Sequence, residues 1–269
     1  MYDLAICAIF QNESPYLAEW LEFHAIVGVQ HFFLYDHLST DNPSIVLNPY
    51  LHRGDVTLIP WSYPTLDHPE WDALQRRAYE DAVQRTQDKT RWLAFLDIDE
   101  FLFPVQEDNL VDFLRSYEGV SGVCVNWQMY GTSKMTTIPA GRLLIESLLL
   151  KAPTDYDENR LFKSIVKPSD VLSCKNPHLF TYRPGSFQVN PNGEPFVGSR
   201  APYVAVDKVR VNHYWSKDEA YFFKVKAPRR KKWGEGAATM LTRIQSLNQV
   251  EDGAILRFVP ALRRRMGMA

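Results

Sequence analysis

The sequence predicts an α/β fold in which helices flank a central sheet. Three observations support this class: short apolar runs typical of buried strands, amphipathic stretches with helical spacing between them, and turn residues at the junctions. The chain has 269 residues, of which 45% are hydrophobic and 23% are charged. We therefore expect residues 1–269 to form a single globular domain.

The chain opens with the order strand, helix, strand. Residues 3–10 form an apolar run typical of a buried strand. A helix follows, for which Ser14 is the expected N-cap and Pro15 the first helical residue. Gly28 ends this helix, and residues 31–36 form the second strand. Two strands joined by a crossover helix predict parallel pairing.

The alternation of strands and helices then continues. The pattern predicts helices at 41–51, 69–87 and 110–117, and strands at 56–60, 92–96 and 123–129. Beyond residue 130 it loosens, and frequent prolines and glycines between 153 and 202 predict loops and short strands. A late strand is expected over 204–211, and Ser216 with Glu219 forms a capping box that opens a short helix.

Charge and cysteine content exclude some functions and favour others. A net charge of −2 gives no global basic field, so no nucleic-acid partner is expected. Three cysteines without CxxC spacing suit a reducing compartment, and Cys7 and Cys124 lie in apolar runs typical of a core. No basic leader is visible, so we expect a cytoplasmic location. The basic runs 229–232 and 263–265 suit either peripheral contact with an anionic membrane or plain solvation.

The most pointed chemical signal is Asp97-Ile98-Asp99 at the end of an apolar strand. Ligands of open parallel sheets bind beyond the carboxyl ends of strands, and alternate residues of an extended segment face the same way. Two adjacent carboxylates repel each other, and a divalent cation resolves the conflict. Oxygen ligands suit Mg²⁺ or Mn²⁺, which also bind phosphate oxygens. We predict a metal–diphosphate site; the alternative is a turn cap or surface ion pairs.

Several motifs around this pair carry a resemblance. They are Phe10-Gln11-Asn12-Glu13-Ser14-Pro15-Tyr16-Leu17, Glu19-Trp20-Leu21-Glu22-Phe23-His24, Gly28-Val29, Phe32-Phe33-Leu34-Tyr35-Asp36, Ser39-Thr40-Asp41, Gln75 with Ala78-Tyr79, and Leu96-Asp97-Ile98-Asp99-Glu100-Phe101-Leu102. Together they resemble the opening of glycosyltransferase family 92, over roughly residues 4–104. Past residue 120 the likeness is patchy.

The resemblance implies a GT-A fold, which is a Rossmann-like nucleotide-diphospho-sugar transferase with a mixed sheet flanked by helices. It implies Mn²⁺ or Mg²⁺ on the Asp-x-Asp motif and an inverting transfer of a hexose, such as galactose, from a UDP-sugar to a hydroxyl. Gln11 stands where the family usually has lysine, so this position lacks a positively charged side chain. The second half of the chain diverges from the family, so the resemblance does not identify the acceptor, which we expect to be a glycan or a lipid-linked sugar.

In this frame residues 1–120 would bind the donor and residues 121–269 would complete the metal and acceptor sites. The residues expected to bind the donor are Ala8, Phe10, Asn12, Glu13, Asp36, Arg76, Asp97, Ile98, Lys224 and Lys226. Each has a plainer alternative. The negative charge of Glu13 would interact favourably with the dipole of the helix that follows it, and Asp36 would stabilise a turn with Ser39. Arg76 or Arg77 and the two lysines would be solvated surface.

The remaining predictions concern the metal and the acceptor. His213 would join Asp97 and Asp99 as a metal ligand, or be a structural histidine. Inversion needs a general base, and Asp155, Asp157, Glu158 and His178 are the candidates. Trp127 and Tyr130 would stack on a sugar or fill the core. Two rival functions stay open: a sugar nucleotidyltransferase, which expects a glycine-rich loop after the first strand, and a non-catalytic nucleotide- or carbohydrate-binding module.

Overall fold

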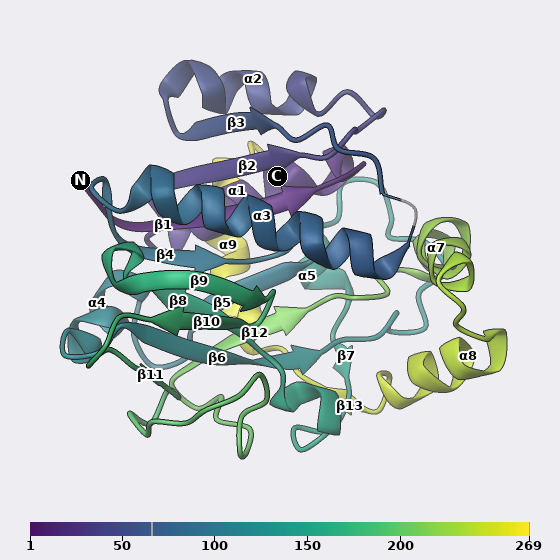
Figure 1. The fold of residues 1–269 in the computed structure, drawn as a ribbon. Coiled ribbons are helices and arrows are strands. Elements are labelled where there is room, and N and C mark those ends of the chain that lie inside the picture. Colours follow the sequence, from purple (N-terminus) through teal and green to yellow (C-terminus); the bar gives the residue numbers. More distant parts are fainter. Residues whose placement is uncertain (66, 269) are drawn as a thin grey trace.

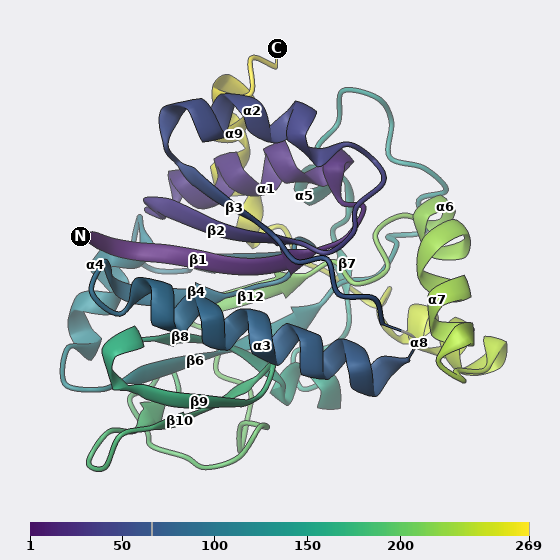
Figure 2. The same cartoon turned by 45° about the horizontal axis from the view of Figure 1, so that its top comes forward.

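The computed structural model describes residues 1–65 and 67–268, and these form a nine-stranded mixed sheet with helices on both faces (Figures 1 and 2). The strand order is β3-β2-β1-β4-β8-β6-β12-β5, and β11 pairs with β6 outside this path. The strands of the sheet are β1 (Tyr2–Phe10), β2 (His31–Asp36), β3 (Val56–Pro60), β4 (Thr90–Phe95), β5 (Glu100–Pro104), β6 (Gly122–Met129), β8 (Phe162–Val166), β11 (Gln188–Val189) and β12 (Val209–His213).

The sheet has a parallel half and a mixed half. Strands β3, β2, β1 and β4 are parallel, as the strand–helix–strand pattern predicted. Strand β8 runs antiparallel to both β4 and β6, while β12 is parallel to β6 and antiparallel to β5. Two small sheets complete the fold, one from β9 (Val171–Asn176) and β10 (Leu179–Tyr182), the other from β7 (Leu150–Lys151) and β13 (Val250–Glu251). The predicted α/β class with a mixed sheet flanked by helices is confirmed.

Strand β1 shows why the apolar run at the N-terminus folds as it does. Its alternate residues enter two different cores, because successive side chains of a strand point to opposite faces. Leu4, Ile6 and Ala8 belong to the core beneath α1, whereas Ala5 and Cys7 belong to the core beneath α3. All five are fully buried, so every position of this stretch must be apolar.

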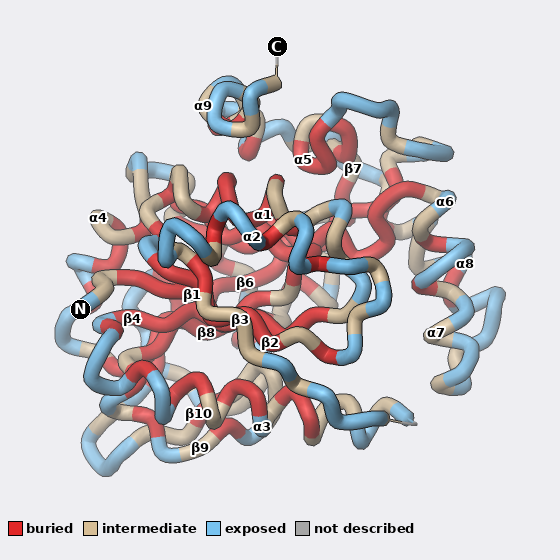
Figure 3. The backbone as a smooth tube through the Cα atoms, turned by 90° about the horizontal axis from the view of Figure 1, so that it is seen from above, coloured by how far each residue is buried: buried red, intermediate tan, exposed pale blue. Residues whose placement is uncertain are grey.

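The helices cover the two faces and one end of the sheet. Figure 3 shows that burial concentrates in the strands, while the outer helices expose one side. The helices are α1 (Ser14–Ile26), α2 (Pro43–Arg53), α3 (His68–Thr86), α4 (Leu110–Leu114), α5 (Leu144–Ser147), α6 (Glu219–Tyr221), α7 (Ala227–Lys232), α8 (Ala237–Ser246) and α9 (Val259–Arg265). Within the described part of the chain, no helix is long and apolar enough to cross a membrane.

Several local predictions were wrong, each for an identifiable reason. The N-cap of α1 is Glu13 rather than Ser14, whose backbone N–H instead donates to Asp41 at 2.8 Å. The late helix is capped by Asp218 rather than Ser216, because the Asp218 carboxylate accepts from the Tyr221 N–H. The late strand is Val209–His213 rather than 204–211, since only this stretch pairs with β5 and β6.

Candidate active site

The carboxyl ends of β1 and β4 open into a pocket of about 520 Å³. Helices α7 and α8 lie beyond these strand ends, so they form the outer wall of the pocket (Figure 1). The lining combines strand ends, the start of α3 and the basic late helices. It includes Phe10, Glu13, His68, Trp71, Gln75, Asp97, Ile98, Asp99, Trp127, Glu158, Lys163, His178, His213, Trp215, Lys226, Arg229, Arg230, Trp233 and Arg243.

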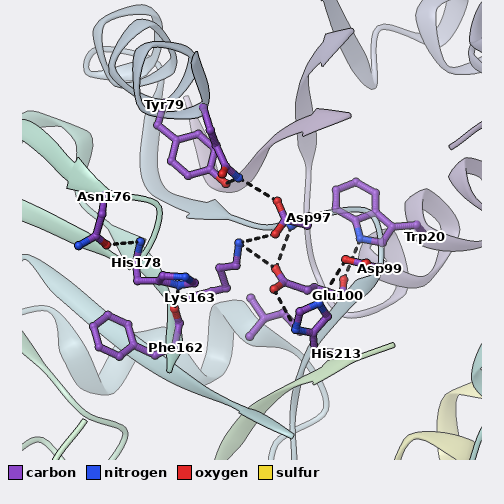
Figure 4. Close-up of polar contacts among 12 residues, drawn as sticks. Trp20, Tyr79, Asp97, Asp99, Glu100, Phe162, Lys163, Asn176, His178 and His213 are labelled. Atoms are coloured by element: carbon purple, nitrogen blue, oxygen red, sulfur yellow. Dashed lines mark hydrogen bonds and ion pairs between the residues drawn. The ribbon is translucent and has the colours of Figure 1, made fainter. Parts of the chain in front are cut away.

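Asp97 is held in place by two partners from other elements. Its Oδ1 accepts from the Gln75 amide at 3.0 Å, and its Oδ2 accepts from Lys163 Nζ at 2.8 Å. Lys163, on β8, also lies 3.3 Å from Glu100 (Figure 4). Although burial opposes its charge, the carboxylates of Asp97 and Glu100 raise the pKa of Lys163 well above its usual value. Lys163 is therefore a permanent buried cation in the floor of the pocket.

Glu100 follows the Asp-x-Asp motif and is fully buried. Its Oε2 accepts from the Asp97 backbone N–H at 2.9 Å, and its backbone carbonyl accepts from the Trp20 indole at 2.8 Å. Burial raises the pKa of Glu100 to about 7, against the opposing charge of Lys163. Glu100 thus fixes the turn that presents Asp97 and Asp99.

Asp99 turns toward a different set of groups. Its Oδ2 accepts from Lys226 Nζ at 2.9 Å, and its Oδ1 lies 3.5 Å from His213 Nε2. Burial opposes ionisation, but the charges of Lys226 and His213 hold the pKa of Asp99 well below its usual value. The two aspartates therefore share a strand end but contact different neighbours, as Figure 4 shows for Asp97 with Lys163 and Asp99 with His213.

These contacts decide how well the residues fit a divalent cation. Across residues 1–65 and 67–268, no group of three or more His, Cys, Asp or Glu side chains is arranged to hold a metal ion. Asp99 and His213 nevertheless offer an oxygen and a nitrogen 3.5 Å apart on the pocket wall. Such a pair fits two positions of an octahedral shell whose other positions are phosphate oxygens and water. Both oxygens of Asp97 already accept hydrogen bonds.

The structure brings part of the predicted donor set to the pocket. Phe10, Glu13, Asp97, Ile98 and Lys226 line it. In the described part of the chain, five further predicted residues lie outside the lining: Ala8, Asn12, Asp36, Arg76 and Lys224.

The contacts of these five residues explain their positions. Ala8 is buried in the core. Asn12 Oδ1 accepts from the Thr40 N–H at 2.7 Å, and Asp36 Oδ1 accepts from the Ser39 N–H at 3.1 Å, so both stabilise the turn after β2. Lys224 is exposed, and Arg76 is half-buried on α3.

Of the candidate bases, Glu158 and His178 line the pocket. Glu158 pairs with Arg243 at 3.2 Å. Asp157 is 75% exposed and pairs with Arg200, and Asp155 is exposed as well. His178 Nδ1 lies 2.8 Å from the Phe162 carbonyl, which can only accept, so Nδ1 carries the proton and Nε2 the lone pair. Burial and the charge of Lys163 lower the pKa of His178 to about 4.

Sequence reasoning missed most of the basic and aromatic wall. Arg230 stacks between Trp215 and Trp233, 5.5 Å and 5.8 Å from the ring centroids. Among the described residues, the buried Nε of Arg229 has no hydrogen-bond partner. The sequence predicts that the run 229–232 is solvated or contacts a membrane, whereas in the fold Arg229 and Arg230 line the pocket.

The remaining aromatic and basic candidates lie in different environments. Trp127 lines the pocket, with its ring centroid 4.5 Å from that of His213, whereas Tyr130 is fully buried in the core. In the terminal basic run, Arg263 and Arg265 pair with Glu146 and Glu22 of the same chain, at 2.8 Å and 2.6 Å.

Comparison with known proteins supplies independent findings. The family model described as glycosyltransferase family 92 matches residues 2–250. The family 92 protein Os08g0121900 of Oryza sativa subsp. japonica is 31% identical over 183 residues, covering 66% of this chain and 28% of that protein. The galactan beta-1,4-galactosyltransferase GALS3 of Arabidopsis thaliana is 28% identical over 129 residues, covering 45% of this chain and 25% of that protein.

The chain spans only part of these relatives, 28% to 37% of the length of the first three curated proteins that it matches. Among solved structures, residues 1–349 of S. aureus TarS align with a TM-score of 0.43 at 12% identity, covering 86% of this chain and 65% of that chain.

Proposed function

The chain belongs to glycosyltransferase family 92, and we propose that it transfers a hexose from a uridine diphosphate sugar to a hydroxyl of a glycan acceptor. The names of the galactosyltransferases among its relatives favour galactose as the hexose. The observation that carries the proposal is the pocket itself. Asp99 and His213 line it together with the basic residues Lys226 and Arg229. A pocket with this charge distribution suits a metal-bound diphosphate.

In this proposal the cationic side chains bind the departing diphosphate. Lys226 lies 2.9 Å from Asp99, and Arg229 lines the same pocket and supplies a second positive charge. Asp99 and His213 would hold Mn²⁺ or Mg²⁺, which when bound neutralises charge on the leaving diphosphate. Lys163 binds Asp97 Oδ2 at 2.8 Å and orients it, so that the motif retains its shape when the donor enters.

Inversion requires a base for the acceptor hydroxyl, and His178 is the candidate that we favour. Its Nδ1–H is fixed on the Phe162 carbonyl, so the basic Nε2 is oriented by a backbone contact. Burial lowers its pKa to about 4, so the ring is neutral at pH 7 and the lone pair of Nε2 can accept a hydrogen bond from the acceptor hydroxyl. Trp127 packs edge-on against this ring at 5.0 Å, in the part of the pocket where a sugar ring would stack. Glu158, the alternative, is already paired with Arg243.

The test is a UDP titration with and without Mn²⁺, combined with an assay of UDP-galactose hydrolysis and transfer. We expect Mn²⁺ to tighten UDP binding and Asp99→Asn to abolish both this tightening and turnover. Asp108→Asn, which changes an exposed carboxylate outside the pocket, is the matched control and should behave as wild type. Full turnover in Asp99→Asn would overturn the assignment. An affinity for UDP that is the same with and without Mn²⁺, together with no turnover of any nucleotide sugar, would favour a binding module.

A further inference from the structure

A second pocket, of about 380 Å³, is distinct from the candidate active site. It is lined by Thr154, Asp155, Arg160, Tyr203 and Val204. These residues come from two loops, 153–160 and 201–205, in the half of the chain where the family resemblance does not identify the acceptor. None of them has a role in the proposed binding of the donor.

The loops around this pocket are held in place by hydrogen bonds from Asn159 and Arg160. Asn159 is fully buried: its Nδ2 donates to the carbonyls of Pro153 and Thr154, at 3.0 Å and 3.1 Å, and its Oδ1 accepts from the Met129 N–H at 2.8 Å. Arg160 and Ala201 join the two loops through a backbone hydrogen bond of 2.8 Å and an Arg160 Nε bond of 2.9 Å. The pocket is therefore preformed on the end of β6 and does not require a ligand to shape it.

The two pockets are neighbours across a single turn. The 3₁₀ turn Asp157–Arg160 carries Glu158, which lines the candidate active site, and Arg160, which lines the second pocket. A 3₁₀ helix rises about 2 Å per residue, so these two positions are about 4 Å apart along the turn. The boundary is also tied by Arg200 of the larger pocket, which pairs with Asp157 at 2.5 Å. The two pockets are therefore separated by the turn Asp157–Arg160.

The chemistry of the lining suits a neutral sugar. Tyr203 leaves 41% of its surface exposed, and its hydroxyl is held by Asn190 and Asn192, each at 3.1 Å, and by Glu194. A fixed aromatic ring of this kind offers a flat apolar face beside polar groups, as a pyranose requires. Asp155, Arg160 and Thr154 supply hydrogen-bonding groups whose formal charges cancel, which disfavours a phosphate.

We propose that the second pocket is an acceptor subsite that holds an internal sugar of a glycan chain while the end of the chain lies in the larger pocket. This inference rests on the proposed function, since it assumes that a glycan is the acceptor. It adds a prediction about acceptor length: a chain long enough to reach Tyr203 binds more tightly than a single sugar, because the second pocket contributes only to the longer ligand.

The experiment compares β-1,4-linked galactotetraose with methyl β-galactoside on the whole chain. Without donor, we expect titration calorimetry to detect galactotetraose binding that weakens at least tenfold in Tyr203→Ala. In turnover with UDP-galactose, we expect the same variant to raise the KM for galactotetraose about tenfold and to leave the kcat, the KM for methyl β-galactoside and the rate of donor hydrolysis unchanged. Tyr203→Phe keeps the ring and should retain most of the affinity.

Two further variants keep the test decisive. Asp155→Ala alters an exposed lining residue, so it serves if Tyr203→Ala does not fold, and it should also weaken galactotetraose binding. Phe187→Ala removes a 43% exposed aromatic ring outside both pockets and should have no effect. Equal affinity of wild type, Tyr203→Ala and Asp155→Ala for galactotetraose would overturn the subsite. Variant-sensitive binding without turnover of any UDP-sugar would support the subsite and reject the proposed function.

Discussion

Lys217 tests the contacts that attach the late helix α6 to the start of α1. Its side chain is fully buried, and its Nζ forms an ion pair with Glu13, the N-cap residue of α1. The same ammonium lies 3.6 Å from the ring centroid of Tyr16 and 4.1 Å from that of Tyr221. The residue adopts φ +50°, a left-handed conformation that is uncommon outside glycine and that these contacts must stabilise.

The cost of Lys217→Met follows from these contacts. Removing one partner of a buried ion pair costs about 3–5 kcal/mol, because the other charge stays desolvated. The Glu13 side chain keeps 14% of its surface exposed and still accepts from the Tyr221 hydroxyl at 3.2 Å, which favours the lower end of this range. Methionine fills most of the lysine volume, so the cavity contribution is small. We expect the free energy of unfolding to fall by about 3 kcal/mol.

Urea denaturation followed by tryptophan fluorescence measures this change, and a thermal scan should show a lower Tm by roughly 6–12 °C. Lys231→Met changes an exposed lysine of α7 and is the matched control, for which we expect a change within about 0.5 kcal/mol. The double variant with Glu13→Gln should lose less than the sum of the two single changes, since both remove the same pair. A loss below about 1 kcal/mol for Lys217→Met would refute the reasoning, because that is the value of an exposed pair.

Two further predictions concern stability. Burial raises the pKa of Glu19 to about 7 from its ordinary 4.5, so the folded state binds the extra proton and stability falls as pH rises through this window. The advantage of wild type over Glu19→Gln in urea denaturation should therefore shrink by on the order of 3 kcal/mol between pH 4 and pH 8; a constant difference would contradict the burial. Gly131→Ala places a Cβ 2.8 Å from the Leu247 carbonyl and should cost about 1–3 kcal/mol, whereas Gly119→Ala meets no atom within 4 Å and should cost less than 1 kcal/mol; equal Tm values for the two would contradict the close packing.

The sequence predicted well where local pattern is sufficient. The bounds of β2 and β3 match because each is an apolar run between turn residues. The Asp-x-Asp motif was found because it ends such a run, and the pocket does lie there. Asp36 has a contact with the Ser39 N–H, the turn role given as its alternative.

What the sequence could not provide is the partner of each charge. Lys163 binds Asp97 across 66 positions of chain, and no local periodicity encodes the insertion of β8 between β4 and β6. The sequence pattern predicts Ser216 as the N-cap of the late helix, but serine and aspartate both cap helices, and only the observed hydrogen bond identifies Asp218 as the cap. The position of Arg229 and Arg230 at the pocket could not be predicted, because a run of four basic residues is consistent with contact to an anionic membrane as well as with solvation.

The placement of β12 between β6 and β5 also constrains how the protein is made. Strands β5 and β6 leave the ribosome long before residues 209–213, and each keeps an unpaired edge on that side until β12 inserts. His213 is the last residue of β12, so it reaches Asp99 only at this late step. Pairing between such distant segments is slow, and a nascent chain stalled before residue 209 would present two open edges to other chains. The insertion of β12 therefore has two effects: it completes the pocket, and it covers the two strand edges that could otherwise pair with other chains.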